Sequence, residues 1–468
     1  EIAAGRVSAL QVTRAYLRRI AALDDSGPML SAVIEINPDA EAIARELDER
    51  RKRERGNLGP LHGVPVLLKA NIDTADRMAT SAGSLALAEH RARADADVVA
   101  NLRAAGAVVL GKTNLSEWAN FRSTKSTSGW SSLGGQTRNA YVLDRNPCGS
   151  SSGSAVAVAA RLAPLAVGTE TDGSIVCPAG INGVVGIKPT IGTVSQRGIV
   201  PIAHSQDTAG PLARTVADAA LLLRVLAQSG APTYTHVNVA GLRVGVVRDF
   251  GGSGREAAVE TSFSAALRQL EAAGVVLVDP VMAAPPPEVA NAERTILFAE
   301  FKDDIGKYLA NVEAGPRTLE ALIAFNASHA VQVMPHFGQE IFQAAHEGAG
   351  TAGADYASAL ELVAAERAAL SELFREHDIV ALVAPANGRA WLTNYETGSG
   401  PRIGSSRIAA ITGFPSVAVP AAVVGELPIG MAFIGRPQDE ATLFAVAAAF
   451  EDVRGSLPEP QFLTTVAD

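Results

Sequence analysis

One stretch of the chain, residues 146–190, combines features that suit nucleophilic catalysis. It reads NPCGSSSGSAVAVAARLAPLAVGTETDGSIVCPAGINGVVGIKPT, with a Gly/Ser cluster, a small-residue run and a Thr/Asp/Gly/Ser turn. Small residues let the backbone approach a ligand closely, and consecutive N–H groups before a serine can form an oxyanion hole. These features favour a catalytic segment over the simpler interpretation, in which two polar loops flank a buried helix.

A serine nucleophile needs a base, and one lysine upstream has suitable surroundings. Lys69 ends the run Gly-Val-Pro-Val-Leu-Leu-Lys, which is typical of a buried strand. A lysine among apolar neighbours loses solvation, which disfavours its charged form and lets it act as a base. The sequence therefore contains both parts of a serine–lysine catalytic site.

A second serine pattern overlaps the Gly/Ser cluster. Residues 149–153 match Gly-x-Ser-x-Gly, the nucleophile elbow of α/β hydrolases, which would make Ser151 the nucleophile. An elbow must follow a strand, but residues 144–148 are polar and contain proline. We therefore disfavour the elbow.

Seven motifs, in their order and spacing, resemble the amidase signature family. They cover nearly the whole chain and are densest from Gly63 to Ala219. Within the family, the run TETDGSIVCP at residues 169–178 is most similar to bacterial peptide amidases. The motifs are GVP and Lys69 (63–69), NLSEWA (114–119), GQTRN (135–139), CGSSSGS (148–154), GTETDGS (168–174), DTAGPLAR (207–214), and the closing GFP (413–415), LPIG (427–430) and GRP (435–437).

The resemblance implies a catalytic triad of Ser174 as nucleophile, Ser150 as bridging serine and Lys69 as base. The peptide bond to Ser150 is cis in such enzymes. Neutral Lys69 takes a proton from Ser150, which takes one from Ser174, and an acyl-enzyme forms. The implied oxyanion hole consists of the backbone N–H groups of Thr171, Asp172, Gly173 and Ser174.

Two further positions, Ser151 and Thr169, match residues that hydrogen-bond the lysine in relatives. The chain also departs from the commonest family pattern. Asp172 replaces the first of two glycines before the nucleophile, and Val176 stands where many members have arginine. Asp172 either recognises a substrate amide N–H or hydrogen-bonds locally, and the sequence leaves both open.

The substrate is less well defined, because family members accept fatty amides, aryl amides, carbamates or C-terminal peptide amides. We expect the pocket to form from residues 77–80, 121–130, 293–342 and 386–405, with Thr124, Ser126 and Trp130 binding substrate. Further candidate aromatics are Phe337, Trp391 and Tyr395.

The function predicted is hydrolysis of a carbon–nitrogen amide bond in a peptide-amide-like, aryl or small amide. One alternative is a carbamate (urethane) or aryl-acylamide hydrolase of the same family. Another is the glutaminase subunit of an amidotransferase, which works only with a partner. A non-enzymatic binding module would lack the catalytic residues, and all three are present.

Apolar and amphipathic runs alternate along the chain, which predicts an α/β fold. The resemblance implies the amidase signature fold, a central mixed twisted β-sheet with helices on both faces. We expect one amidase domain over residues 1–468, with the signature core at 60–220 and a helical substrate-pocket region at 290–375.

Particular elements follow from the pattern. Ser8 and Gln11 form a capping box before the first helix. The run 155–167 is expected to be a small-residue helix, and 279–287 a surface connector. The expected strands are 64–68, 107–110, 242–247, 379–384, 416–419 and 429–434, and the expected helices are 216–226, 256–273 and 442–451.

Composition restricts partners and location. The net charge of −9 disfavours nucleic acid and anionic membranes, and no apolar run is long enough to span a bilayer. We expect a small-molecule amide as the only partner, in a monomer or homodimer. Since no signal peptide is evident, a cytoplasmic location is expected, although a leader before Glu1 could have been removed.

The sequence also contains few candidate ligands for a metal or cofactor. Cys148 and Cys177 are too few for a disulfide framework or a four-thiolate zinc site, and we expect both to be free thiols. The histidines form no His-Glu-x-x-His motif, and no phosphate loop or dinucleotide fingerprint is present. We therefore predict an enzyme that needs neither metal nor cofactor.

Overall fold

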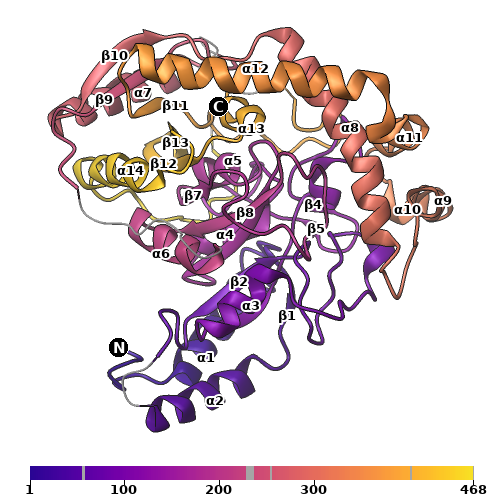
Figure 1. Cartoon of the computed structure of the whole chain (residues 1–468). Helices are drawn as coiled ribbons and strands as arrows, with labels where there is room; N and C mark the ends of the chain where they lie inside the picture. Colours follow the sequence, from indigo (N-terminus) through magenta and orange to yellow (C-terminus); the bar gives the residue numbers. More distant parts are fainter. Residues whose placement is uncertain (55–57, 228–236, 253–255, 401–402, 467–468) are drawn as a thin grey trace.

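A mixed sheet of eleven strands forms the centre of the computed structural model (Figure 1). The structure describes residues 1–54, 58–227, 237–252, 256–400 and 403–466. In spatial order the strands are β1 (Val33–Ile36), β3 (Val108–Thr113), β2 (Pro65–Lys69), β6 (Leu165–Glu170), β8 (Thr208–Ala213), β7 (Val185–Lys188), β12 (Ser416–Val424), β13 (Leu427–Gly435), β11 (Ala381–Pro385), β9 (Arg243–Val247) and β10 (Val276–Val281).

Strand direction brings two polar side chains to the same edge of this sheet. β2 and β6 run parallel, with Leu68 opposite Val167. The carboxyl ends of adjacent parallel strands meet at one edge, so Lys69 at the end of β2 lies near Thr169 at the end of β6. This edge carries the candidate site.

Alternation along β2 decides which face Lys69 points to. Val66 and Leu68 belong to the hydrophobic core on one face, whereas Leu67 belongs to the core on the other. Side chains two residues apart in a strand share a face, so Lys69 points to the face of Leu67. The helices of that face include α4 (Ser152–Ala159) and α5 (Val176–Ile181).

Helices cover both faces, as the family resemblance implied. α1 (Ala9–Leu23) and α2 (Ala40–Arg53) pack on the same face as α4 and α5. The predicted capping box begins α1, with Ser8 Oγ accepting from Gln11 N–H. The opposite face carries α3 (Asp97–Ala104), α6 (Val216–Leu226), α7 (Ala257–Ala272) and α14 (Glu440–Arg454).

A group of helices after β10 lies beside the sheet (Figure 1). Most of residues 290–375, expected to be helical, lies in helices, and α8 packs against α12 and α11. These helices are α8 (Pro287–Leu309), α9 (Leu319–Ser328), α10 (Ala330–Val333), α11 (Glu340–Glu347) and α12 (Ala354–Glu376).

Two predicted elements are wrong. The helix expected over 155–167 ends at Ala159, where Arg161 takes a left-handed conformation with φ +57° and the Leu162 N–H donates back to Ala157 O, and residues 165–170 form β6. The surface connector expected over 279–287 is partly strand β10, and its Ala284 and Pro285 line a cavity. The six predicted strands and three predicted helices all occur, with boundaries shifted by at most a few residues apart from longer β12.

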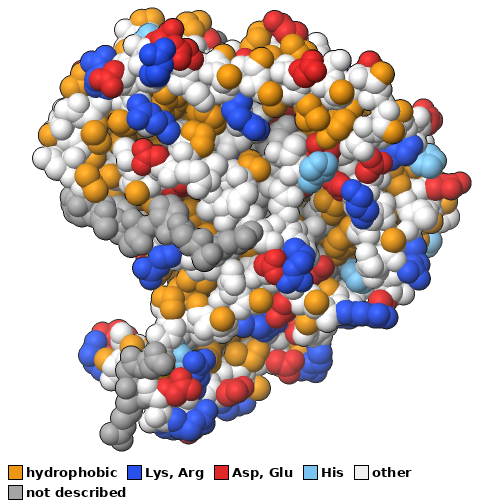
Figure 2. Space-filling model, in the orientation of Figure 1, with side chains coloured by type: hydrophobic (Ala, Val, Ile, Leu, Met, Phe, Trp, Pro, Cys, Tyr) orange, Lys and Arg blue, Asp and Glu red, His pale blue; other side chains and the backbone are white. Residues whose placement is uncertain are grey.

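The surface carries both charge signs. Basic and acidic side chains are interspersed on the face shown in Figure 2, over α12 and over the α1–α2 end. Among the helices of the described residues, none is long and apolar enough to cross a membrane.

Candidate active site

Lys69 is completely buried at the end of β2, and its ammonium nitrogen has hydroxyl and carbonyl partners. Nζ lies 2.7 Å from Ser150 Oγ, 2.8 Å from Thr169 Oγ1 and 3.1 Å from Thr169 O. Burial lowers the pKa of Lys69 to about 7, opposed by the negative charges of Asp207 and Glu170. The amine is therefore suited to exchanging a proton near neutral pH.

Ser150 is held in a loop that admits no larger residue before it. The Gly149–Ser150 peptide bond is cis, as the resemblance implied. A Cβ on Gly149 would lie 2.2 Å from Ser116 Oγ, so glycine is required there. Ser116 also donates its N–H to the Ser150 carbonyl at 3.1 Å. The Asn-Leu-Ser motif thus positions Ser150 against Lys69.

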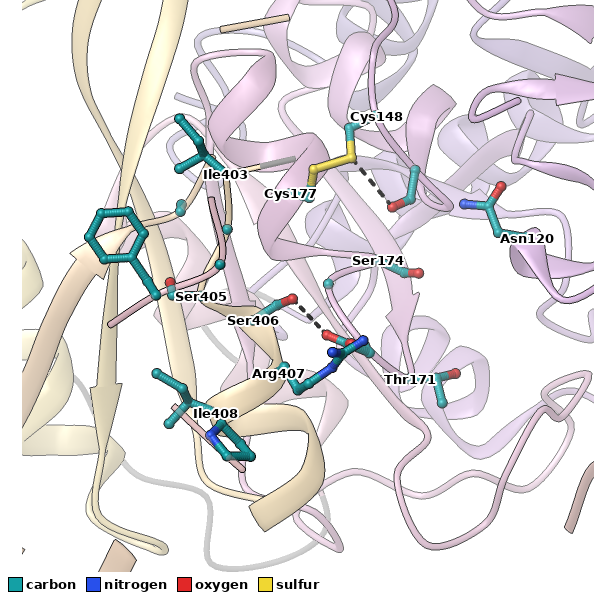
Figure 3. A pocket seen from close by; sticks show the side chains of 18 of the residues that line it. Asn120, Cys148, Thr171, Ser174, Cys177, Ile403, Ser405, Ser406, Arg407 and Ile408 are labelled. Carbon is teal, nitrogen blue, oxygen red and sulfur yellow. Dashed lines mark hydrogen bonds and ion pairs between the residues drawn. A yellow bond between two sulfur atoms is a disulfide. The ribbon is translucent and has the colours of Figure 1, made fainter. Parts of the chain in front are cut away.

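Ser174 lies in the turn between β6 and α5, at the wall of a cavity of about 550 Å³. Figure 3 shows its hydroxyl pointing into the open space between Cys148, Asn120 and Thr171. Its carbonyl accepts the Ser151 N–H at 3.1 Å, which ties the Ser174 turn to the Ser150 loop. Gly173 has φ +76°, a conformation that glycine adopts without strain.

The backbone N–H groups before α5 divide into two sets. Those of Ile175 and Val176 donate to Glu170 Oε2 at 2.6 and 2.9 Å. Among hydrogen bonds between described residues, the N–H groups of residues 171–174 donate to none. Glu170 therefore anchors the turn from behind and leaves the four N–H groups of the predicted oxyanion hole available to a ligand.

Ser151 does not occupy the place that the resemblance implied. Its Oγ donates to Thr169 O at 3.0 Å and accepts the Thr169 N–H at 3.1 Å, while Lys69 bonds to Thr169 and Ser150. Ser151 begins α4, so its side chain meets the backbone of the adjacent β6. Its support of the lysine is indirect, through Thr169.

The carboxylate of Asp172 hydrogen-bonds within the protein. Oδ1 accepts Ser406 Oγ–H at 2.6 Å, and Oδ2 lies 3.8 Å from Arg407 Nε (Figure 3). Arg407 Nε also lies 3.3 Å from Glu293 Oε2, and burial raises the pKa of Glu293. Of the two sequence-based alternatives for Asp172, the structure favours local bonding.

The cavity is built from segments far apart in the sequence. Besides residues near Ser174, it is lined by Asn120, Phe121, Leu297 and short segments at 249–251, 284–285 and 403–408. Residues 401–402 of the expected pocket segment 386–405 lie outside the described residues. The sequence does not predict that Asp249, Phe250, Ser406 and Arg407 line this cavity. No local pattern around these residues indicates that they face Ser174.

The three residues expected to bind substrate do not line this cavity. Thr124 donates to Glu340, and Ser126 donates to Asn120 Oδ1 at 3.0 Å, one residue behind the wall. Trp130 packs edge-on against Phe337 at 5.2 Å. Of the three, only Ser126 contacts a residue of the cavity wall in these interactions.

Comparison with known proteins decides the family. The family model described as Amidase matches residues 11–444. The chain belongs to the amidase family. A solved peptide amidase from Stenotrophomonas maltophilia has 46% identity and a TM-score of 0.92, covering 98% of this chain and 96% of that one.

Two curated relatives match at lower identity. A protein of Arabidopsis thaliana named a probable amidase is 37% identical over 98% of this chain and 89% of its own length. A glutamyl-tRNA(Gln) amidotransferase subunit of Symbiobacterium thermophilum is 34% identical over 96% of this chain and 94% of its own. Together with the solved neighbours, the family identifies the chain as an amide-hydrolysing enzyme.

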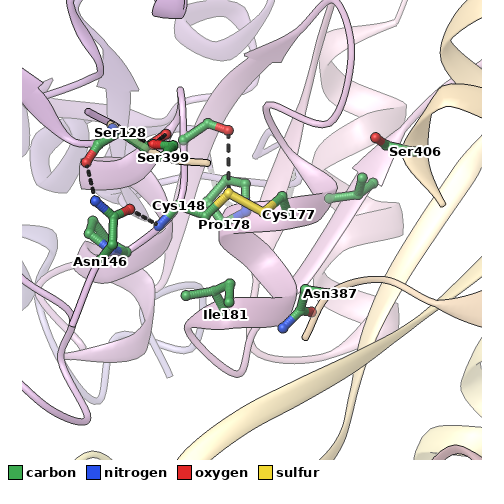
Figure 4. The surroundings of a disulfide bond; sticks show 12 residues. Ser128, Asn146, Cys148, Cys177, Pro178, Ile181, Asn387, Ser399 and Ser406 are labelled. Carbon is green, nitrogen blue, oxygen red and sulfur yellow. Dashed lines mark hydrogen bonds between the residues drawn. A yellow bond between two sulfur atoms is a disulfide. The ribbon is translucent and has the colours of Figure 1, made fainter. Parts of the chain in front are cut away.

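One prediction about this enzyme is wrong: the two cysteines are not free thiols. Cys148 and Cys177 form a disulfide (Figure 4). Cys148 lies two residues before Ser150, and Cys177 lies three residues after Ser174 in the first turn of α5. The fold brings the Ser150 loop and the Ser174 turn together, and a sequence separation of 29 residues does not reveal this proximity.

The described residues include one group with metal-ligand geometry, His204, Glu300 and Asp304. Their atoms already have protein partners: His204 Nδ1 lies 2.6 Å from Asp304 Oδ2, and Glu300 accepts from Tyr356 Oη at 2.8 Å. Lys307 also pairs with Asp304. These hydrogen bonds and ion pairs account for the clustering of the three side chains.

Proposed function

We propose that this amidase hydrolyses the C-terminal amide of peptides through an acyl-enzyme on Ser174, with Ser150 relaying protons to Lys69. The observation that carries the proposal is the 2.7 Å contact between a buried, easily deprotonated Lys69 and Ser150. The adjoining nucleophile turn and the cavity supply the remaining parts of the site.

The chemistry begins with neutral Lys69. It removes the Ser150 hydroxyl proton while Ser150 removes that of Ser174, whose oxygen attacks the amide carbon. The proton then passes back along the same path to the amide nitrogen, and ammonia leaves. Water repeats the sequence on the acyl-enzyme, so that one amide and one water become one acid and one ammonia.

The developing oxyanion would be held by the N–H groups of residues 171–174. Their lack of partners among described residues supports this role, because such donors give up no protein hydrogen bond when the oxyanion forms. Such donors contribute about 3 kcal/mol each to stabilising the transition state.

The substrate class is supported by two observations. The peptide amidase neighbour shares 46% of its residues with this chain across nearly its full length, which favours a peptide amide over the alternatives. The cavity, about 550 Å³, combines apolar side chains such as Phe121, Phe250 and Ile403 with polar groups near Ser174. That volume suits the last residue or two of a peptide.

A hydrolysis panel tests the proposal. One dipeptide sequence is offered as its C-terminal amide, its anilide and a matching carbamate, with free glutamine as a fourth substrate. We expect ammonia release from the peptide amide with the highest kcat/KM, and no turnover by Ser174→Ala.

Other outcomes of the panel distinguish the alternatives. Preference for the anilide or carbamate would contradict the peptide-amide assignment while retaining the triad. Glutamine hydrolysis that appears only after a partner protein is added would instead favour the amidotransferase function.

A further inference from the structure

A second cavity, of about 150 Å³, lies behind the proposed base. Its walls combine apolar and polar side chains and come from β6, β8 and the loop between β7 and β8, together with Asn71 after β2, Ala119 and Asp304 of α8. The residues that matter are Asn71, Thr169, Thr171, His204, Asp207 and Asp304. Apart from Thr171, whose N–H group belongs to the proposed oxyanion hole, none of these has been given a role in recognising the amide substrate.

The cavity reaches the partners of Lys69. Thr169 lines it, and Thr169 Oγ1 lies 2.8 Å from Lys69 Nζ and 3.0 Å from Asn71 Nδ2. A molecule in the cavity that bonds to Thr169 therefore contacts the lysine's partner directly. A molecule that bonds to Asn71 reaches the same partner through one further hydrogen bond.

Asn71 provides evidence that the cavity takes a polar ligand. Its side chain is 3% exposed and lines the cavity, yet its Oδ1 has no hydrogen-bond partner. If the amide is turned over, its nitrogen is left in the same position instead. A buried amide group without a partner costs about 1–3 kcal/mol, so a ligand that bonds to it is stabilised there.

The cavity is separated from the substrate pocket by a hydrogen-bonded partition. Ala119, Thr171 and Ile202 line both spaces. Thr171 Oγ1 donates to Asp207 Oδ1 at 2.5 Å, and the Ile202 N–H donates to Asp207 Oδ2 at 2.7 Å. The other end of the cavity lies at His204, whose side chain is 54% exposed. The cavity thus meets solvent at His204.

We propose that this cavity is a water-binding site whose waters connect Thr169 and Asn71 to bulk solvent at His204. The volume is large enough for a short file of waters, and the polar groups of Asn71, Thr169, Asp207 and His204 along it give them partners. The file of waters solvates Thr169 and Asn71 next to Lys69. It lets Lys69 exchange protons with solvent while substrate fills the cavity at Ser174.

The consequence for Lys69 is a measurable pH dependence. The charged groups that act on Lys69 are Asp207 and Glu170, and both favour its protonated form. Water in the cavity favours that form too. Replacing the water by hydrocarbon therefore lowers the pKa of Lys69 and moves the rise of activity to lower pH. This part rests on the proposed function, whereas water binding does not.

A crystal structure of the full chain tests water binding directly. We expect ordered waters within hydrogen-bond distance of the Asn71 amide and continuing toward His204. A dry cavity, or one closed by movement of Asn71, would overturn the proposal. This result does not depend on any activity, so it stands apart from failure of the proposed function.

A filling variant tests the effect on Lys69. Val200 is buried and lines the cavity, so Val200→Phe displaces water, while Val331→Phe adds the same atoms at a position that is 90% exposed. The readout is the pH dependence of Ser174 labelling by a fluorophosphonate. We expect a midpoint about one pH unit lower for Val200→Phe, within the range that burial produces, and a wild-type midpoint for Val331→Phe.

An unchanged midpoint in a Val200→Phe protein whose crystal structure shows the cavity filled would overturn the role in proton exchange. If Val200→Phe does not fold, Asn71→Leu removes the polar anchor and is expected to lower the midpoint in the same direction. A labelling profile insensitive to Lys69→Ala would instead count against the proposed function.

Discussion

Lys69 Nζ lies 2.7 Å from Ser150 Oγ, and no salt bridge between described residues includes this lysine. A carboxylate partner would hold the ammonium charge, whereas hydroxyl and carbonyl partners do so only weakly. Burial therefore dominates, and the pKa of Lys69 falls from 10.5 to about 7. This pKa suits Lys69 to its proposed role as a base at ordinary pH.

The pH dependence of acylation follows from that pKa. Lys69 must be neutral to accept a proton, so activity is low at pH 5, half-maximal near the pKa of about 7, and maximal above it. We expect kcat/KM for a peptide amide to rise along a single titration curve. A profile that is flat from pH 5 to 9 would contradict a lysine base with this pKa.

Replacing the base should remove both the rate and the curve. General base catalysis contributes about 10²–10⁴-fold, so Lys69→Ala is expected to lose activity by that order and to flatten the rising limb. His204→Ala is the control, since His204 is an exposed titratable group beside the second cavity. If Lys69→Ala kept the wild-type pH profile of activity and His204→Ala lost it, the base would be His204.

Glu170 is expected to act by positioning the oxyanion turn. It accepts the N–H groups of Ile175 and Val176, and burial raises its pKa. Glu170→Gln keeps the shape but weakens this anchor, so kcat should fall by about 10²-fold with little change in KM, because small displacements are costly at reacting atoms.

The matched control for this variant is Glu451→Gln. Glu451 likewise accepts a backbone N–H at a helix start, that of Val216 in α6, and it does not line the substrate cavity. Equal losses of kcat in both variants, or a loss confined to KM in Glu170→Gln, would show a general structural effect instead.

The disulfide is expected to support both stability and the relative placement of the two serines. It closes a loop with a sequence separation of 29, for which chain-entropy arguments give about 3–4 kcal/mol in the free energy of unfolding. Reduction by a dithiol should lower Tm and kcat, and reoxidation should restore both. The double variant Cys148→Ser, Cys177→Ser should be insensitive to the dithiol. Wild-type Tm after complete reduction would contradict this.

Local patterns predict the parts of the fold that local physics determines. Continuous apolar runs identify β2, β9 and β13, because strands buried on both faces need no alternation. The sequence of β6 instead suggests a helix, since its small apolar residues continue those of α4 without a change of character. Only pairing with β2 and β8 reveals it as a strand.

The candidate site is predictable where one segment carries it. The Gly/Ser cluster and the turn before Ser174 are visible in the sequence, and family resemblance relates them to Lys69. The wall of the substrate cavity is not predictable in this way. Phe250 and Arg407 lie far from Ser174 in the sequence, and only the fold brings them to the cavity. The Cys148–Cys177 bond escapes prediction for the same reason, since it depends on two loops meeting in space.

The central claim is that the Ser174 oxygen becomes acylated. The most direct measurement is mass spectrometry of the enzyme quenched in acid during turnover of a slowly hydrolysed amide, followed by peptide mapping. We predict a mass increase equal to the acyl group on the peptide that contains Ser174. This increase should be absent from Ser174→Ala and from the peptides that contain Ser150. Acylation of Ser150 or Ser151, or turnover by Ser174→Ala at the wild-type rate, would contradict the account.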